Sequence, residues 1–456
     1  MAGIGFELRK LLKKDSFTGL FQAYLFAGVI GSGPWIISIL AMLLINFLSL
    51  KAVYLPELIA QFQVTVTWLI AFSLIFTGGL QLYFTRYIAD RLFEHQPSRV
   101  LPGLHAAVLA SFAISLPTVA AFLILTFDDV PVLYQLLVFT TFALLCLVWL
   151  LTVLLTGLKQ YKMIILIYFL GYGSMLALNP WFAQWGKEGL LASFMLGQTI
   201  LVLGMSALVW KEYPSPRLID FDIFKKGRGF PSLLATGFLF NFGVWIDKII
   251  FWLGPTGSPV LGGLRASPIY DSPIFLAYLT IIPGMAVFIM RIETDFAEAY
   301  DRFYQTVRSG GALSTILHLQ QEMTFCARES IFDIIKVQTI TALAIIASGP
   351  ALLKVFGLDP LYAPLFHVNV IGVGIQVILI GALNILFYLD KRLEVLVVSA
   401  VLAALNTGLT LFTLQMGPEL YGYGFVAGML GATVVALKII DKELRELSYK
   451  TFMMST

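Results

Sequence analysis

The sequence predicts an all-α polytopic membrane protein with about twelve transmembrane helices in two groups of six. Hydrophobic residues make up 59% of the chain and charged residues only 12%, whereas soluble globular proteins carry roughly 25% charge. Apolar runs of the length that crosses a bilayer as a helix recur along the whole chain. Lysines and arginines gather between alternate runs, as the positive-inside rule requires of a membrane protein.

The apolar runs define the expected spans. A helix needs about 20 mostly apolar residues to cross the hydrocarbon core. The runs that meet this requirement are 18–48, 60–84, 102–127, 131–157, 163–183, 188–210, 230–253, 272–291, 336–356, 362–389, 393–415 and 419–438.

The positive charges orient these spans. With a cytoplasmic N-terminus, all 30 lysines and arginines fall on cytoplasmic segments except Lys51, Lys187, Lys248, Arg265 and Lys354. A miscounted span would scramble this separation, because every later loop would change sides. The bias therefore predicts a multi-pass protein with both termini in the cytoplasm.

The N-terminal part of the chain contains two unusual features. Residues 1–16 are basic and amphipathic, which predicts either an interfacial helix on the bilayer surface or a solvated basic lead-in. The first span then carries glycines around Pro34, followed by Trp35, and proline interrupts helical hydrogen bonding. We expect a kink there, either lining a cavity or serving only helix packing.

A polar, basic stretch rich in proline and glycine, 211–229, divides the spans six and six. We therefore expect an N-lobe over 1–215 and a C-lobe over 216–456. Both groups start on the cytoplasmic side, and Gly243-Val244-Trp245 echoes the first span, so a parallel repeat is expected. The loop 254–271 either covers the outer mouth of the protein or is flexible.

The longest cytoplasmic segment is 292–335. Its apolar residues recur at helical spacing on both sides of a Gly-Gly break, which predicts a helical hairpin. The hairpin either docks a cytoplasmic partner or folds back on the protein's own underside. The acidic residues that would present such a docking face are Glu293, Asp295, Glu298 and Asp301.

The stretch Phe238 to Trp252 is the most informative apolar run, because it carries an acid and a base together. A charge at the centre of a membrane helix costs about 2.5–3.5 kcal/mol, so such residues are functional-site candidates. Residues at i and i+1 do not face each other on a helix. We therefore expect Asp247 and Lys248 not to neutralise one another.

The two charges differ in reach. Lysine has a long side chain that can extend to the interface, so we expect Lys248 to do so. Asp247 cannot, and it is the stronger candidate. It is interpreted as a proton or cation site, a counter-ion to Lys354 or Arg265, or part of a polar solute path.

Other polar residues inside or near spans are weaker candidates. Singly, each is more often an interhelical hydrogen bond worth about 0.6 kcal/mol than a ligand. The candidates for the transport path are Asn241, Trp245, Arg86, Gln198 and Asn369, with Gln376, Asn384 and Asn406 as further polar positions.

The sequence argues against several functions. A net charge of +3 is too small to indicate nucleic acid as a partner. There is no P-loop or glycine-rich nucleotide fingerprint, and the four histidines have no metal-ligand spacing. An enzyme, a cofactor and a metal site are therefore not expected. Cys146 lies inside an apolar run and Cys326 in a polar loop assigned to the cytoplasm, so no disulfide is expected.

Four motifs together resemble a known family. They are the opening Met1–Leu12, the Ser32–Trp35 kink, the stretch Trp245–Trp252, and the run from Tyr270 to Phe296 with its Ile281-Ile282-Pro283-Gly284-Met285 core. The chain resembles the PelG family, inner-membrane components of the bacterial Pel exopolysaccharide system, over essentially its whole length.

The resemblance implies a fold and a substrate. It implies membership of the multidrug/oligosaccharidyl-lipid/polysaccharide exporter superfamily, with two six-helix lobes around a central cavity, as in MATE transporters and flippases, and alternating access. The first and seventh spans would then line the cavity, which gives Pro34 and Asp247 matching positions. The substrate would be a polymer rich in N-acetylgalactosamine, exported across the cytoplasmic membrane for the biofilm matrix.

The resemblance also implies partners. These are the cytoplasmic glycosyltransferase PelF and the membrane proteins PelD and PelE, with cyclic di-GMP read by PelD. Three alternatives stay open at this point: a flippase of lipid-linked oligosaccharide, a cation-coupled multidrug antiporter, and a membrane scaffold for a glycosyltransferase.

Overall fold

The computed structural model describes residues 56–156, 161–225 and 229–453, with a few positions between 27 and 44. The described chain is helical except for one small hairpin and connecting turns. It forms two compact units, which we call the N-terminal unit, Pro34–Asp271, and the C-terminal unit, Ser272–Thr456 together with Met1–Gly33. The predicted interfacial helix 1–16 and the predicted kink at Pro34 and Trp35 lie outside the described residues.

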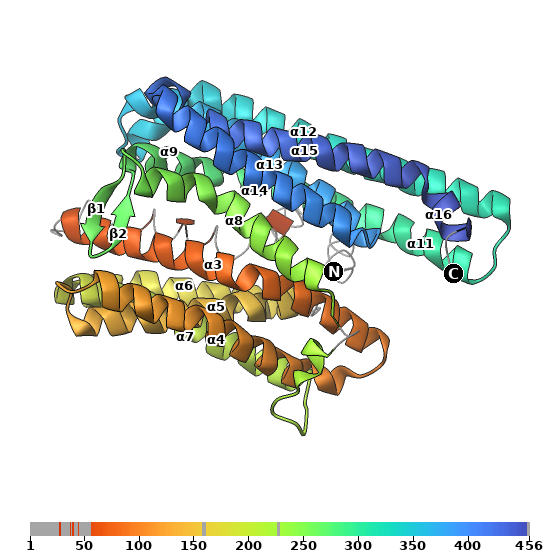
Figure 1. The fold of residues 1–456 in the computed structure, drawn as a ribbon, viewed down its shortest axis with the longest axis horizontal. Coiled ribbons are helices and arrows are strands. Elements are labelled where there is room, and N and C mark those ends of the chain that lie inside the picture. Colours follow the sequence, from red (N-terminus) through yellow and green to blue (C-terminus); the bar gives the residue numbers. More distant parts are fainter. Residues whose placement is uncertain are drawn as a thin grey trace. The chain divides into compact units, whose positions relative to one another are not determined.

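The N-terminal unit consists of long helices joined by short 3-10 turns (Figure 1). Its elements are α3 (Pro56–Phe93), η1 (Pro97–Arg99), α4 (Val100–Thr126), α5 (Val132–Thr156), α6 (Tyr161–Phe182), η2 (Ala183–Trp185), α7 (Gly186–Glu212), η3 (Phe221–Phe224), α8 (Pro231–Leu253), β1 (Ser258–Leu261) and β2 (Leu264–Ala266).

Helices α3 and α8 run side by side in the N-terminal unit, the first orange and the second green in Figure 1. Glycines allow this close approach. A Cβ atom on Gly237 of α8 would lie 2.1 Å from the carbonyl oxygen of Gly78 on α3. Membrane helices commonly pack through such small residues, because the bilayer offers no hydrophobic drive between helices. This seam holds α8, with its charged pair, against α3.

The loop after α8 is ordered. Strands β1 and β2 pair antiparallel, with Ser258 opposite Ala266 and Pro259 opposite Arg265. This loop therefore contains regular structure, and its expected position over the outer mouth stays a prediction. The hairpin leads directly into α9 (Pro268–Tyr278), whose first residues belong to the N-terminal unit.

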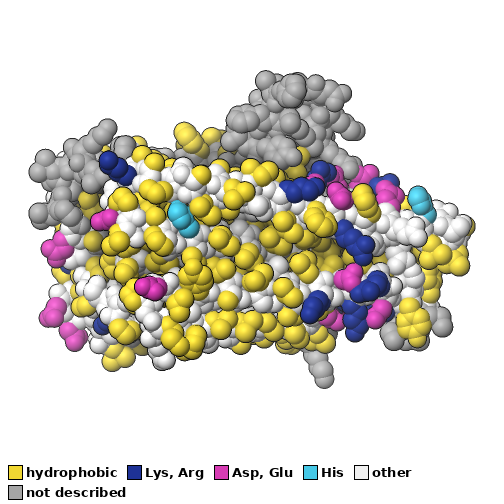
Figure 2. All heavy atoms as spheres, turned by 90° about the horizontal axis from the view of Figure 1, so that it is seen from above, with side chains coloured by type: hydrophobic (Ala, Val, Ile, Leu, Met, Phe, Trp, Pro, Cys, Tyr) yellow, Lys and Arg dark blue, Asp and Glu magenta, His cyan; other side chains and the backbone are white. Residues whose placement is uncertain are grey.

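The C-terminal unit is a second helical bundle. On the face seen in Figure 2, hydrophobic side chains cover most of it, and charged side chains gather most densely where α12 begins and α15 ends. Its elements are α10 (Ile281–Met290), the π-helical turn η4 (Arg291–Phe296), α11 (Ala297–Arg308), α12 (Leu313–Val355), η5 (Pro360–Tyr362), α13 (Ala363–Tyr388), α14 (Arg392–Met416), η6 (Pro418–Leu420), α15 (Tyr423–Arg445) and α16 (Leu447–Met453).

The structure confirms an all-α polytopic membrane protein. Among the described residues, 10 segments are long and apolar enough to cross a membrane. One of them, Met163–Glu212, contains both α6 and α7. Each expected span from the second to the twelfth therefore corresponds to described helices, one helix each except for the eighth, 272–291, which is divided between α9 and α10. The first expected span lies mostly outside the described part of the chain.

The structure refines one boundary and leaves another as a prediction. The second arm of the expected hairpin 292–335 is not a separate helix, because α12 continues unbroken from Leu313 to Val355. The expected lobe boundary between 215 and 216 concerns a repeat and stays a prediction. The compact units divide elsewhere, within α9 between Asp271 and Ser272, so that α8 belongs to the same unit as α3, on which it packs.

Candidate functional site

Helix α8 positions the charged pair at the centre of a buried polar network. The helix starts with Pro231 at its first turn, a favoured position for proline, and ends before Gly254. Asp247 and Lys248 both have 0% exposed surface. Lys248 Nζ donates to Asp247 Oδ1 at 3.1 Å and to the carbonyl oxygen of Val244 at 2.8 Å. The hydroxyl of Tyr270 donates to Asp247 Oδ2 at 2.7 Å.

This geometry corrects two expectations from the sequence. Asp247 and Lys248 do neutralise one another, although they are adjacent in sequence. The four-carbon lysine side chain bends back over the preceding turn to reach the carbonyl of Val244, and this brings Nζ beside the aspartate. Lys248 therefore does not extend to the interface, and it is as buried as its partner.

A second carboxylate, Asp271, anchors the end of α8. Its Oδ1 accepts from the indole N–H of Trp252 at 2.8 Å, and its Oδ2 accepts from the backbone N–H of Ser267 at 2.9 Å. Arg265 donates to the carbonyls of Trp252 at 3.0 Å and Gly257 at 2.6 Å. Asp247 is thus bonded to Lys248 and Tyr270, while the guanidinium of Arg265 is used on backbone carbonyls.

Sequence reasoning missed Tyr270 and did not place Asp271. The useful signal was the short distance in sequence between them and α8. A β-hairpin returns the chain to its starting point, so residues just after it must lie beside the end of α8. Phe251 and Tyr270 confirm this return, because their rings stack with centroids 3.8 Å apart.

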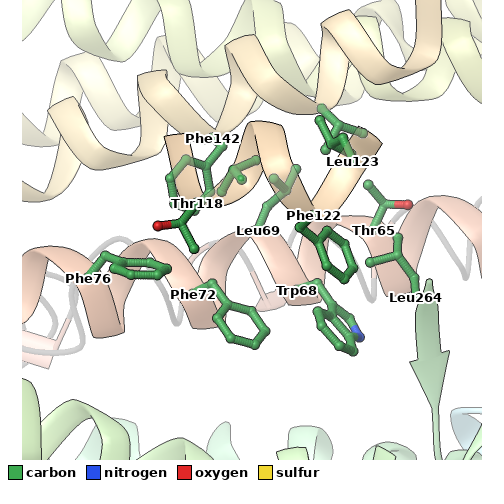
Figure 3. A pocket seen from close by; sticks show the side chains of 12 residues that line it. Thr65, Trp68, Leu69, Phe72, Phe76, Thr118, Phe122, Leu123, Phe142 and Leu264 are labelled. Carbon is green, nitrogen blue, oxygen red and sulfur yellow. The ribbon is translucent and has the colours of Figure 1, made fainter. Parts of the chain in front are cut away.

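An apolar cavity of about 140 Å³ adjoins the network. Trp68 connects the two, since its ring stacks on Trp252 at 5.0 Å and its N–H donates to the carbonyl of Arg265 at 2.8 Å. Figure 3 shows the rings of Trp68, Phe72 and Phe76 following one another along α3. The remaining lining comes from α4, α5 and β2: Thr118, Val119, Phe122, Leu123, Val138, Phe142 and Leu264, with Thr65 and Leu69 of α3.

Asn241 and Trp245 lie on the same helix as the charged pair. The Asn241 amide donates to the carbonyl of Gly237 at 2.9 Å, in the seam between α8 and α3. Trp245 is buried, and Lys248 Nζ lies 5.8 Å from the centroid of its ring. Both residues therefore belong to the surroundings of the network.

The contacts found for Arg86 and Gln198 among the described residues do not join them to this network. Arg86 pairs with Asp90 at 3.1 Å and lies 5.5 Å from the ring centroid of Phe230. Gln198, on α7, has 0% exposed surface, and neither amide atom has a hydrogen-bond partner among the described residues.

The remaining transport candidates belong to the C-terminal unit. Asn369, on α13, is fully buried, and within the part of the chain that the structure describes both of its amide atoms lack a hydrogen-bond partner. Lys354 is exposed near the end of α12. Pro34 and Trp35 are not among the described residues.

Glu293 was expected to present a docking surface, and the structure instead buries it. It sits in the π-helical turn η4 with 3% exposed surface. It accepts from the Asn384 amide at 3.1 Å and from the Tyr388 hydroxyl at 2.9 Å. The wider π turn directs this side chain into the bundle, so Glu293 cannot take part in docking a partner.

The other three acidic residues remain partly accessible. Asp295 pairs with Arg291 at 2.9 Å, and Glu298 lies 4.0 Å from Arg302. Asp301 is half-buried. Within the described ranges, no group of three or more histidine, cysteine, aspartate or glutamate residues could hold a metal ion.

Comparison with solved structures defines the class of this fold. The chain is similar to an outward-facing multidrug resistance MATE family transporter of the MOP superfamily, with a TM-score of 0.68, 12% identity, and coverage of 93% of this chain and 96% of that one. It is similar to MATE in a bent conformation, with a TM-score of 0.66, 13% identity and coverage of 98% of each chain. It is also similar to a MOP superfamily transporter from Pyrococcus furiosus, with a TM-score of 0.58, 12% identity, and coverage of 98% of this chain and 94% of that one. The protein therefore has the MATE fold.

The particular family follows from the sequence. The model of the PelG family, described as "Putative exopolysaccharide Exporter (EPS-E)", matches residues 1–452. This chain belongs to the PelG family. A search of curated proteins found no match.

Proposed function

We propose that this protein exports a Pel-type exopolysaccharide, rich in N-acetylgalactosamine, across the bacterial cytoplasmic membrane by alternating access. Membership of the PelG family over residues 1–452 is the observation that carries the proposal. The MATE fold supports it, because solved structures with this fold are described as transporters. A non-enzymatic exporter agrees with the family description.

The proposal assigns the network around Asp247 a role in transport. A buried acid–base pair inside an apolar helix is costly, and such residues in membrane helices commonly mark a functional path. Its connection through Tyr270 to the β-hairpin would let movement of the hairpin alter the charge balance on α8.

The test uses a strain that lacks the gene and is complemented with variants. Secreted polymer is measured with a lectin that binds N-acetylgalactosamine, and membrane protein is measured by immunoblot. The variant Asp247→Asn/Lys248→Met removes both charges together, so it leaves no unpaired buried ion. We expect normal protein level and strongly reduced secretion.

The control replaces a comparable but exposed pair, Asp441→Asn/Arg445→Met at the end of α15, and should secrete normally. Secretion at the wild-type level in the Asp247/Lys248 double variant would reduce the network to a structural element. Unchanged secretion in the strain lacking the gene would overturn export itself.

A flippase of lipid-linked oligosaccharide is the second candidate, since the same family description and fold support export or flipping. The two differ in what accumulates when the protein is absent. Labelled sugar recovered in a lipid extract of the deletion strain indicates a flippase, whereas its absence with unpolymerised sugar in the cytoplasm indicates polymer export.

We also propose that the cytoplasmic arm of α12 docks the glycosyltransferase PelF, with PelD and PelE in the same complex. Phe325 and Phe332 support this, because they are 64% and 56% exposed beside charged neighbours. The two residues are seven positions apart on α12 and so lie on one face of the helix. Apolar patches rimmed by polar residues commonly mark protein contacts. Deleting 292–335 would cut α12, so point variants give the better test.

The docking test compares Phe325→Ser/Phe332→Ser with Phe93→Ser, an exposed phenylalanine at the end of α3. We expect the double variant to lose co-purification of PelF and the control to retain it. Equal recovery of PelF with both variants would show that α12 does not dock it.

We also propose that the C-terminus lies in the cytoplasm. A C-terminal fluorescent or alkaline phosphatase reporter tests this location.

A further inference from the structure

The cavity beside Trp68 offers almost no hydrogen-bonding group to a ligand. Only Thr65, Trp68 and Thr118 among its lining residues carry polar side-chain atoms. The Thr65 hydroxyl is engaged by the carbonyl of Gln61 at 2.8 Å and by the Tyr134 hydroxyl at 2.7 Å. The Thr118 hydroxyl donates to the carbonyl of Ile114 at 2.8 Å, and the Trp68 N–H donates to Arg265.

This chemistry selects an apolar occupant. A sugar hydroxyl entering the cavity would give up its hydrogen bonds to water and find no replacement, which opposes binding. The volume of about 140 Å³ is close to that of an engineered cavity of roughly 150 Å³, lined by leucine, isoleucine and phenylalanine, that stays dry and binds benzene or xenon. The cavity therefore suits a hydrocarbon group of similar size.

The location of the cavity identifies the source of that hydrocarbon. Its walls are the membrane helices α3, α4 and α5, together with Leu264 of β2. Helix α4 exposes large apolar side chains such as Ile114 and Leu125, at 65% and 75%, as expected of a lipid-facing helix. Thr118, on the same helix, is exposed and lines the cavity, so it marks an opening. Acyl chains form the hydrocarbon core of a bilayer, so they are the hydrocarbon that such an opening meets.

We propose that the cavity between α3, α4 and α5 binds an acyl chain of a membrane phospholipid. The chain enters beside Thr118 and lies against the rings of Trp68, Phe72 and Phe76 (Figure 3). Because Trp68 also stacks on Trp252 and bonds to the β-hairpin, the bound chain supports the wall that separates the bilayer from the buried network.

The test places the purified full-length protein in nanodiscs that contain a small fraction of phospholipid with a diazirine on one acyl chain. After irradiation, peptide mass spectrometry locates the label. We expect labelling concentrated on residues 68–76 and 118–123. Thr118→Phe puts a ring in the opening and should lower this labelling by about fivefold or more, because an aromatic ring occupies the space of the chain.

The matched control is Ile114→Phe, one turn earlier on α4 and outside the cavity lining. It should leave the labelling unchanged. A second variant, Val119→Phe, fills the cavity from a neighbouring position and should act like Thr118→Phe if that variant fails to fold. Both variants are checked by gel filtration before labelling.

Two results would overturn the proposal. Equal labelling in Thr118→Phe and Ile114→Phe, or labelling spread evenly over the lipid-facing residues, would mean that no specific site exists. Loss of the label on adding polyprenyl phosphate, at a level where extra unlabelled phospholipid has no effect, would assign the cavity to an isoprenoid chain instead.

Discussion

Two carboxylates, Asp247 in the N-terminal unit and Glu293 in the C-terminal unit, are both buried but are stabilised by different partners. Asp247 lies beside a lysine of its own helix and accepts from Tyr270. The described partners of Glu293 are the amide of Asn384 and the hydroxyl of Tyr388, both neutral donors. The first site is an ion pair, and the second holds a carboxylate through hydrogen bonds.

The two sites are therefore sensitive to different substitutions. Breaking a buried ion pair on one side leaves the other charge without compensation. Removing the charge from a hydrogen-bonded carboxylate leaves only neutral donors, which can partly adapt. The backbone differs as well, since Asp247 lies in a regular α-helix and Glu293 in a π-helical turn, a feature often found at functional sites.

The largest effect is expected for Asp247→Asn. It leaves Lys248 charged and buried, and removing one partner of such a pair costs about 3–5 kcal/mol. The apparent melting temperature in detergent should therefore fall steeply, and the membrane level should fall with it. Adding Lys248→Met should recover most of the loss. A single variant as stable as the double variant would show that the lysine is not charged in the folded protein.

A smaller loss of stability is expected for Glu293→Gln. The neutral amide keeps one acceptor for the two donors Asn384 and Tyr388, and hydrogen bonds to a charged group contribute about 1.5–3 kcal/mol. Thermal unfolding of the purified protein measures it. The matched control, Glu298→Gln, changes a partly exposed side chain in the following helix and should unfold like the wild type. Equal effects at the two positions would refute the role assigned to burial.

Removing the two tyrosine hydroxyls compares the sites directly. Tyr388→Phe and Tyr270→Phe each delete one donor to a carboxylate, and an unsatisfied buried group costs about 1–3 kcal/mol. Tyr388→Phe should destabilise more, because Asp247 retains Lys248 whereas Glu293 retains only Asn384 among the partners described. The reverse order of melting temperatures would contradict the distinction between the sites.

The smallest effect is expected at an exposed pair. Arg302 contacts Glu322 at 2.7 Å, with side chains 48% and 33% exposed. Exposed ion pairs contribute about 0–1 kcal/mol, so Arg302→Ala should change the melting temperature little, and salt should erase the change. A loss comparable to that of Asp247→Asn would mean that ionic contact rather than burial sets the energetics.

The expected spans show how far the sequence reaches in a membrane protein. Runs such as 230–253 and 393–415 agree with α8 and α14 to within a few residues, because a bilayer requires a minimum apolar length for each helix. Agreement is poorer where a helix continues beyond its apolar run. Helix α12 extends into polar sequence, where hydrophobicity no longer marks the helix.

The site was predicted only in part. Asp247 stood out because charge is expensive in a bilayer, and the structure places it in a buried network. Its pairing with Lys248 was wrongly excluded by helix geometry, which describes where side chains start and not where a flexible lysine ends. The prediction for Glu293 was wrong for a different reason. Acidic residues near the end of a span were expected to be exposed, whereas Glu293 is buried.

Local sequence was enough to predict an all-α membrane protein, the order of its described spans and the position of its most costly charge. These features depend on local composition, because each helix must meet the requirements of the bilayer by itself. Tertiary packing was needed to bring Tyr270 and Asp271 back to α8, to join Trp68 to the network and to an apolar cavity, and to turn Glu293 inward. Such contacts depend on how helices pack and where backbones approach closely, and no single stretch of sequence contains that information.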